Sequence, residues 1–255
     1  MEELHNNLIY NKRVVIVGGA PYLKNNGDKI DSYDTVIRVN SSHSLTNKKT
    51  KKDYGSRTDI LYHCLCTDKI NGGPITNDLI DKIQLLVGTI PCLKKNEYPD
   101  SSFKNGYEHM YNKLQPFVLS KFTNVSKDEY ISLENEIGCR PWTGISAINN
   151  ILKHNPKELY ITGFTNGFGG NNINIDKASN QLNYNSYMNV IKSTGYYKCH
   201  DAYKLFLYSQ KKILNNDIIK LDKEYNDILN LPIKNKNDLF NHMYNYPHNL
   251  NNSRL

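Results

Sequence analysis

Long apolar runs are absent from this sequence of 255 residues. The longest, Val14–Val17 and Leu85–Ile90, are far shorter than the roughly 20 residues that a membrane-spanning helix needs. The first residues are polar and include Glu2 and Glu3, a composition that does not fit a signal peptide. We therefore expect no transmembrane segment and a soluble, cytoplasmic protein.

Cysteine is also sparse. The chain has five cysteines, so at least one of them is unpaired, and without a secretion signal a disulfide framework is not expected. Cys64 and Cys66 are separated by a single residue and have no second CxxC or HxxxH pair nearby. This spacing favours buried small side chains over a zinc site, and we expect no bound metal.

A clustered basic stripe is missing, although the net charge is +7 at pH 7. The lysines are spread along the chain, and the abundance of Asn, Lys, Ile and Tyr is typical of an AT-rich genome. Mutational bias therefore explains the charge better than a nucleic-acid-binding surface does, and we expect no nucleic-acid partner.

Short β-branched runs and periodic apolar positions are present along most of the chain. The predicted strands are Arg13–Val17, Tyr33–Asn40, Asp59–Leu65, Gln84–Ile90 and Glu158–Phe164. Two clear helices are predicted over Ile145–Leu152 and His200–Asn215. This alternation predicts one α/β domain over residues 1–233, with a central, mostly parallel sheet flanked by helices. Residues 234–255 are predicted to form a polar C-terminal tail.

Three segments follow predicted strands and are candidates for a ligand site: Gly18-Gly19-Ala20, Asn40 and Gly163-Phe164. In an open α/β sheet, ligands bind beyond the carboxyl ends of the strands. Glycines at such a place let a ligand approach the backbone, and the N–H groups at a helix start hold a phosphate. A tight turn explains Gly-Gly equally well, and Asn40 is also a plausible strand end.

Familiar nucleotide and hydrolase signatures are missing. The glycines after the first strand fit neither GxGxxG nor GxxxxGK[ST], and the chain has no GxSxG and no HExxH pattern. A dinucleotide fold, a P-loop, an α/β-hydrolase and a zinc protease therefore lose their main sequence support. His63 lies on a predicted strand and is interpreted as structural.

The first two predicted strands resemble a known motif. Residues 13–23 (RVVIVGGAPYL) and 30–40 (IDSYDTVIRVN) are similar to the large sialylmotif of glycosyltransferase family 29, the sialyltransferases. In that family the motif forms much of the site for the CMP-sugar.

Two later segments resemble further motifs of the same family. Residues 141–144 (PWTG), with the helix and strand through Phe164, are similar to the small sialylmotif. Residues 199–202 (CHDA) are similar to the very small motif, and Asn183-Tyr184 stands where the family has a His-Tyr pair. The segments occur in the order that the family has.

The resemblance implies a Rossmann-like, GT-A-variant fold and an inverting transfer. A sugar, sialic acid or a related keto-acid sugar, moves from a CMP-activated donor to an acceptor hydroxyl, with His200 as the general base. The implied donor-binding residues are Gly18, Gly19, Ala20, Asn40, Thr143, Gly144, Gly163, Phe164, Asn183 and Tyr184. The implied partners are the nucleotide-sugar donor and a glycan or glycoconjugate acceptor, with no separate cofactor and no metal.

The chain departs from the family at several positions. Gly19 and Ala20 replace an Asn and a Ser, Asn183 replaces a His, and Leu205 replaces a Glu. Two alternatives therefore stay open. One is a catalytically weakened nucleotide-sugar-binding protein, and the other is a different nucleotide-dependent transferase, such as a Mg²⁺-dependent pyrophosphokinase. Thr143 also fits a simple helix cap.

Overall fold

A computed structural model describes residues 1–66, 72–91, 116–168 and 200–245 of the chain. In these residues seven strands form one sheet in the order β5-β4-β3-β2-β1-β6-β7, and every pairing is parallel. The strands are β1 (Arg13–Val17), β2 (Thr35–Val39), β3 (Ile60–His63), β4 (Leu85–Gly88), β5 (Phe122–Asn124), β6 (Glu158–Thr162) and β7 (Ile219–Leu221). The protein therefore has the Rossmann-like α/β fold that the sequence predicts.

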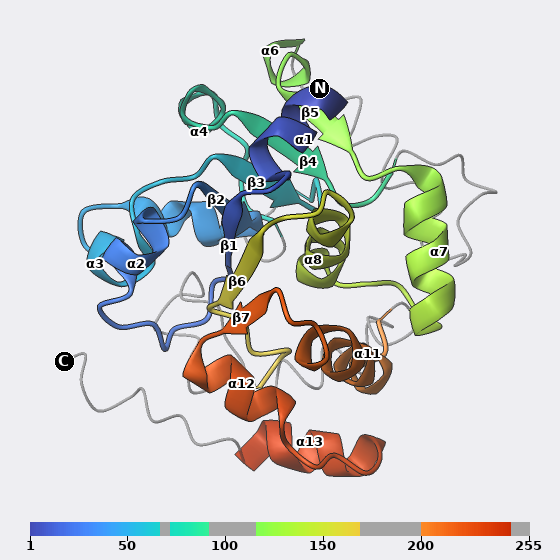
Figure 1. Cartoon of the computed structure of the whole chain (residues 1–255). Helices are drawn as coiled ribbons and strands as arrows, with labels where there is room; N and C mark the ends of the chain where they lie inside the picture. Colours follow the sequence, from blue (N-terminus) through green and yellow to red (C-terminus); the bar gives the residue numbers. More distant parts are fainter. Residues whose placement is uncertain (67–71, 92–115, 169–199, 246–255) are drawn as a thin grey trace.

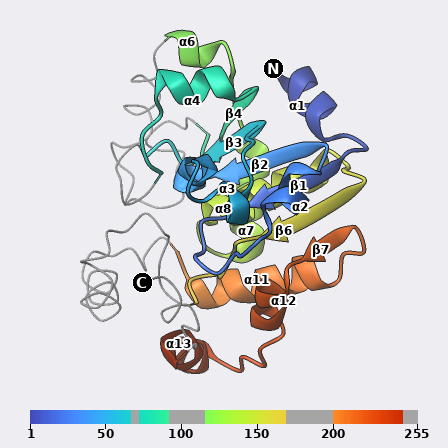
Figure 2. The same ribbon diagram turned by 90° about the vertical axis from the view of Figure 1, so that its left-hand side faces the viewer.

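Helices flank the sheet on both faces. They are α1 (Glu2–Ile9), α2 (Gly27–Asp31), the 3-10 helix η1 (Asn40–Thr46), α3 (Lys51–Tyr54), α4 (Asn77–Lys82), α6 (Pro116–Leu119), α7 (Lys127–Ile137), α8 (Thr143–Lys153), α11 (Ala202–Leu214), α12 (Lys223–Leu229) and α13 (Lys236–Asn245). Figure 1 shows α2 and α3 on one side of the strands and α7 and α8 on the other. In Figure 2 the strands follow one another from β4 to β7, with α11, α12 and α13 beyond β7.

The inner strand β1 shows why the buried strands of this sheet are continuous apolar runs. Both of its faces are buried, so its consecutive side chains all have to be apolar. Val14 and Ile16 point into the main core together with Ile148 of α8, whereas Val15 and Val17 pack on the opposite face. Each fully buried side chain of this size contributes about 1.5–3 kcal/mol through the apolar area it removes from water.

A buried polar network joins α1 to the core. His5 Nε2 lies 2.7 Å from the hydroxyl of Tyr62, and this hydroxyl donates to Asn150 Oδ1, also at 2.7 Å. The amide of Asn150 in turn donates to the buried carboxylate of Glu129 at 2.9 Å. Because the one hydroxyl proton of Tyr62 goes to Asn150, His5 is the donor in its bond to Tyr62. Burial, and secondly the nearby His154, lower the pKa of His5 to about 3.

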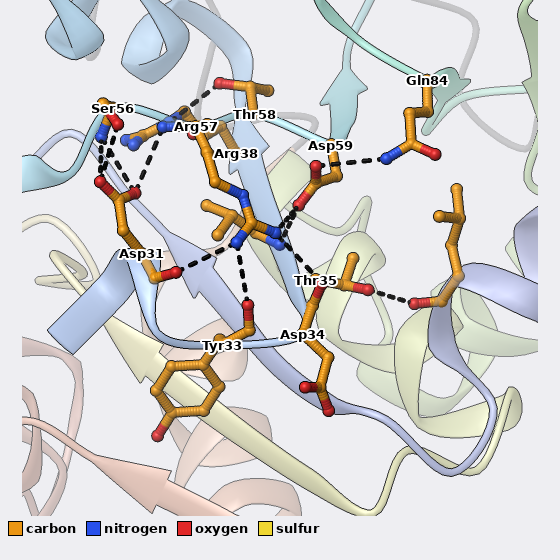
Figure 3. A network of polar contacts seen from close by, with 12 residues as sticks. Asp31, Tyr33, Asp34, Thr35, Arg38, Ser56, Arg57, Thr58, Asp59 and Gln84 are labelled. Atoms are coloured by element: carbon orange, nitrogen blue, oxygen red, sulfur yellow. Dashed lines mark hydrogen bonds and ion pairs between the residues drawn. The ribbon is translucent and has the colours of Figure 1, made fainter. Parts of the chain in front are cut away.

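The charged residues of the segment 30–40 form a second network, at the amino edge of β2 and β3 (Figure 3). The carboxylate of Asp31 accepts hydrogen bonds from the backbone N–H and the hydroxyl of Ser56. Arg57 forms an ion pair with Asp59 at 2.7 Å and donates to the carbonyl oxygen of Asp31 at 3.0 Å. These contacts hold the turns that precede β2 and β3, so Asp31 has a structural role.

The fully buried guanidinium of Arg38 belongs to the face of the sheet that α3 covers. Its Nη2 donates to the carbonyl oxygen of Tyr54 at 2.6 Å, and its Nε lies 2.9 Å from the carbonyl oxygen of Arg57. Burial lowers the pKa of Arg38 to about 10, so the side chain stays charged at neutral pH. A distinctive residue of the sequence motif thus fastens α3 to the sheet.

Part of the predicted polar tail, residues 234–255, is helical. Residues Lys236–Asn245 form the helix α13, in which Leu239 is fully buried and Met243 is 7% exposed. Both side chains join the main core. The polar composition hides this helix in the sequence, because only one narrow stripe of it needs to be apolar.

Two strands were not predicted, β5 and β7. Each has only three residues, and only one residue in each strand, Phe122 in β5 and Ile219 in β7, is both apolar and buried. Such short segments have no sequence pattern that predicts a strand. They lie at the two edges of the sheet, where short polar strands are common. In the described part of the chain, no helix combines the length and the apolar character needed to cross a membrane.

Candidate functional site

The strand order places a topological switch point at β1. From β1 the chain runs outward through β2, β3, β4 and β5, and then returns to β6 on the opposite side of β1. Ligands of open α/β sheets bind in the crevice beyond the carboxyl ends of the strands at such a point. The turn Gly18–Ala20 after β1 and the turn Gly163–Phe164 after β6 flank it.

Backbone hydrogen bonds join these two turns directly. Gly18 N donates to Thr162 O at 2.9 Å, and Ala20 N donates to Gly163 O at 3.0 Å. A Cβ atom on Gly18 would lie 2.2 Å from Gly163 O, and Gly163 itself has φ +74°. Both positions therefore require glycine for the packing of one turn against the other.

The ring of Phe164 fills the space between the two turns and the start of α8. A Cβ atom on Gly144 would lie 2.5 Å from Phe164 Cε1, so glycine at this position lets the helix approach the ring. The contacts of Gly18 and Gly163 fit the tight-turn alternative that the sequence leaves open. Their missing side chains accommodate the protein's own backbone and the ring of Phe164.

Asn40 connects three elements at the carboxyl edge. Its amide nitrogen Nδ2 lies 3.3 Å from the hydroxyl oxygen of Thr143, and its Oδ1 accepts from Cys64 N at 3.0 Å. Asn40 has φ +49°, a left-handed conformation that asparagine tolerates better than most other residues. The structure thereby brings together Asn40 and Thr143, two of the predicted site residues.

Thr143 is the first helical residue of α8 and not its cap. The N-cap is Trp142, whose indole side chain has no oxygen to offer to the first-turn N–H groups. These N–H groups carry the positive end of the helix dipole. The start of α8 therefore presents backbone donors and the hydroxyl of Thr143 beside Asn40.

His200 lies just before α11, with its ring partly buried. Its Nδ1 is 2.9 Å from the carbonyl oxygen of Arg140, on the segment that leads into α8. A carbonyl oxygen only accepts, so Nδ1 carries the hydrogen and the neutral ring has its lone pair on Nε2. This is the tautomer that a general base acting through Nε2 needs.

Asp201 fixes the backbone next to His200. Its carboxylate accepts from Tyr203 N at 3.0 Å and pairs with Lys236 of α13 at 3.2 Å. Burial acts to raise the pKa of Asp201, but the N–H bonds and Lys236 outweigh burial and hold the pKa below its ordinary value. The helix α11 thus begins at a defined residue, directly after the candidate base.

Asp222 is a polar residue of this edge that the sequence analysis missed. It follows β7, and its Oδ2 accepts from Gly163 N at 2.9 Å and from the Tyr22 hydroxyl at 2.9 Å. Burial, and secondly the charge of Asp222, raise the pKa of Tyr22 well above its ordinary value, so the phenol stays protonated. No sequence signal identifies Asp222, because its partners are distant in the chain.

His63, at the end of β3, agrees with its structural interpretation. The ring is fully buried, Nδ1 accepts from Leu65 N at 2.8 Å, and Nε2 is 2.9 Å from Gly72 O. Asn183 and Tyr184 lie outside the described residues. Within the described ranges, no group of three or more His, Cys, Asp or Glu residues is arranged to hold a metal ion.

Comparison of the chain with protein-family models and with curated proteins finds no match. The similarity to sialyltransferase motifs therefore stays a prediction from the residues themselves.

Proposed function

We propose that this protein transfers a sugar from a CMP-activated donor to an acceptor hydroxyl. The observation that carries the proposal is the hydrogen bond between Asn40 and Thr143, which are 103 positions apart. Asn40 ends the segment similar to the large sialylmotif, and Thr143 lies in the segment similar to the small one. Their meeting at the carboxyl edge of the sheet, where ligands of such folds bind, supports a shared donor site.

The start of α8 is the proposed site for the donor phosphate. The first-turn N–H groups and the helix dipole favour a negative charge at this position. The charge of the phosphate grows as the bond to the sugar breaks, so these donors stabilise the transition state more than the bound donor. Gly144 lets the helix start lie close to Phe164, which follows β6.

Thr143 supplies an oriented hydroxyl. Because its oxygen accepts a hydrogen bond from the Asn40 amide, its own hydrogen points elsewhere and is available to the nucleotide. Asn40 thus acts on the donor through Thr143, in addition to any contact of its own.

His200 is the proposed general base. The acceptor hydroxyl oxygen attacks the anomeric carbon, the bond from this carbon to the phosphate oxygen breaks, and CMP leaves with the electron pair. The hydroxyl proton moves to Nε2 of His200, whose tautomer is fixed by the bond from Nδ1 to Arg140 O. Attack from the face opposite to CMP inverts the configuration.

One observation favours the weakened, binding-only alternative. Leu205, which stands where the family has a Glu, is fully buried and packs against Ile145 and Leu133. Position 205 therefore faces the core and offers no carboxylate to a ligand. A protein that binds CMP without transferring sugar would fit this difference.

The His200→Ala variant tests the catalytic proposal. We expect it to bind CMP with wild-type affinity and to lose transfer from CMP-sialic acid to a mixed glycan acceptor, because only the proton acceptor is removed. The matched control is His242→Ala, which removes a half-exposed histidine on α13 whose Nε2 lies 3.5 Å from Asp238 Oδ1. Unchanged transfer by the His200 variant would remove His200 from the role of base. If the wild-type protein itself binds CMP but transfers no sugar, the binding-only alternative is favoured.

A further inference from the structure

Asp222 has no part in the proposed transfer, yet it makes three contacts at the carboxyl edge. Its Oδ1 accepts from Tyr225 N at 2.8 Å and so caps α12. Its Oδ2 accepts from Gly163 N and from the hydroxyl of Tyr22, both at 2.9 Å. A helix cap alone needs only the first of these contacts, so the other two call for a separate explanation.

Tyr22 reaches the same turn from the other side of the switch point. It follows the turn after β1, and its hydroxyl lies 3.0 Å from the carbonyl oxygen of Phe164 as well as 2.9 Å from Asp222. Asp222 thus holds the N–H of Gly163, and Tyr22 reaches the carbonyl of the next residue. Because Tyr22 has a single hydroxyl proton, the carboxylate of Asp222 and the carbonyl of Phe164 share it. The turn is therefore held directly by Asp222 at the Gly163 N–H, and Tyr22 supports it through this shared bond.

This fixation extends to the residues of the proposed donor site. The carbonyl of Gly163 accepts from Ala20 N, so the turn after β6 sets the position of the turn after β1. The ring of Phe164 packs against Gly144 at the start of α8, where the phosphate would bind. A shift of the Gly163–Phe164 turn would therefore move the two turns and the helix start relative to one another.

We propose that Asp222 and Tyr22 are positioning residues for the nucleotide. They touch neither the sugar nor the phosphate, and they set the spacing between the turn after β1 and the start of α8. This inference rests on the proposed function, because it assumes that a CMP moiety binds between these elements. Loss of either contact lets the turn relax and weakens binding of the nucleotide more than it weakens the fold.

The test compares two tyrosines that make the same type of bond. Tyr22→Phe removes a hydroxyl bonded to Asp222 at 2.9 Å, and Tyr33→Phe removes a hydroxyl bonded to Glu158 at 2.9 Å, at the amino edge of the sheet. CMP affinity is measured by calorimetry well below the unfolding midpoint of each variant. We expect Tyr22→Phe to weaken CMP binding by up to about tenfold, because the cost of restoring the turn on binding is at most the free energy of the lost hydrogen bond. Tyr33→Phe should bind CMP like the wild type.

A second pair of variants covers the carboxylate. Asp222→Asn keeps an oxygen for the cap of α12 but no longer presents two charged acceptors, and we expect it also to lose up to about tenfold in CMP affinity. Its control is Asp217→Asn, an exposed carboxylate before β7. If Tyr22→Phe and Asp222→Asn both have lower unfolding midpoints but bind CMP with wild-type affinity, this inference is overturned and the proposed function is not. A wild-type protein that binds no CMP would overturn the proposed function, and this inference with it.

Discussion

Replacement of Asn40 by alanine tests the carboxyl-edge geometry most fully. The side chain makes two hydrogen bonds, to Thr143 and from Cys64 N, and the backbone has φ +49°. Each hydrogen bond contributes about 0.5–1.5 kcal/mol to stability. Alanine in a left-handed conformation costs about 1–2 kcal/mol, a penalty that asparagine partly avoids.

We therefore expect Asn40→Ala to lower the free energy of unfolding by about 2–4 kcal/mol, measured by urea denaturation. Asn40→Gly serves as the matched control, because glycine removes the same hydrogen bonds but accepts the positive φ without strain. It should be about 1 kcal/mol more stable than the alanine variant. CMP affinity should fall in both. A loss of less than about 0.5 kcal/mol in the alanine variant, with unaltered CMP affinity, would refute this reasoning.

Three further predictions follow from other parts of the structure. Burial lowers the pKa of His5 from 6.5 to about 3 in the folded protein, so protonation favours the unfolded chain. His5 should therefore contribute a loss of stability below pH 6.5 of up to about 1.4 kcal/mol per pH unit. His5→Gln should reduce the slope by this contribution in unfolding experiments from about pH 7 to 5, and His43, whose pKa burial lowers to about 4, should account for part of the slope that remains. Leu239→Ala should lower the free energy of unfolding by about 2–5 kcal/mol in urea denaturation, because Leu239 is fully buried. A loss below about 0.5 kcal/mol, as is usual for surface residues, would show that α13 is not part of the core. Gly144→Ala should destabilise by about 1–3 kcal/mol through overpacking against Phe164 and should weaken CMP binding, whereas a neutral effect in both assays would contradict the close approach of helix and ring.

The sequence predicts the sheet well where strands are buried on both faces. The β-branched run of β1 is uninterrupted from Val14 to Val17, and Gly18-Gly19 marks where the strand ends. In β2 the buried Arg38 stands between Ile37 and Val39, and the apolar residues around it still indicate a buried strand. The short edge strands β5 and β7 and the helix α13 lack such patterns, because their burial depends on neighbours that the local sequence does not contain. Tertiary packing therefore decides these elements.

The candidate site was only partly predictable from the sequence. Asn40 and Thr143 stand in recognisable segments, and the structure brings them together. Asp222 stands 200 positions from Tyr22 and 59 from Gly163, so no local pattern indicates that it joins them. The glycines are recognisable as special, but the sequence alone does not show whether a ligand or the protein's own backbone occupies the space beside them.

The motif that resembles the large sialylmotif divides into two parts with different roles. Asp31 belongs to the network at the amino edge, and Arg38 is buried under α3, so both stabilise the sheet. Within residues 30–40, only the last residue, Asn40, lies at the carboxyl edge with Thr143. A resemblance in such a segment therefore supports the fold more strongly than it supports the chemistry.

The central claim is that the carboxyl edge binds a CMP moiety. The most direct measurement is the unfolding temperature of the wild-type protein in titrations with CMP, UDP, GDP and ATP, each with and without Mg²⁺. CMP alone should raise the free energy of unfolding by about 2.7 kcal/mol at a hundredfold excess over its dissociation constant, a shift of about 5–10 °C, and Mg²⁺ should not be required. Stabilisation by ATP only in the presence of Mg²⁺, or no stabilisation by any nucleotide, would contradict the account.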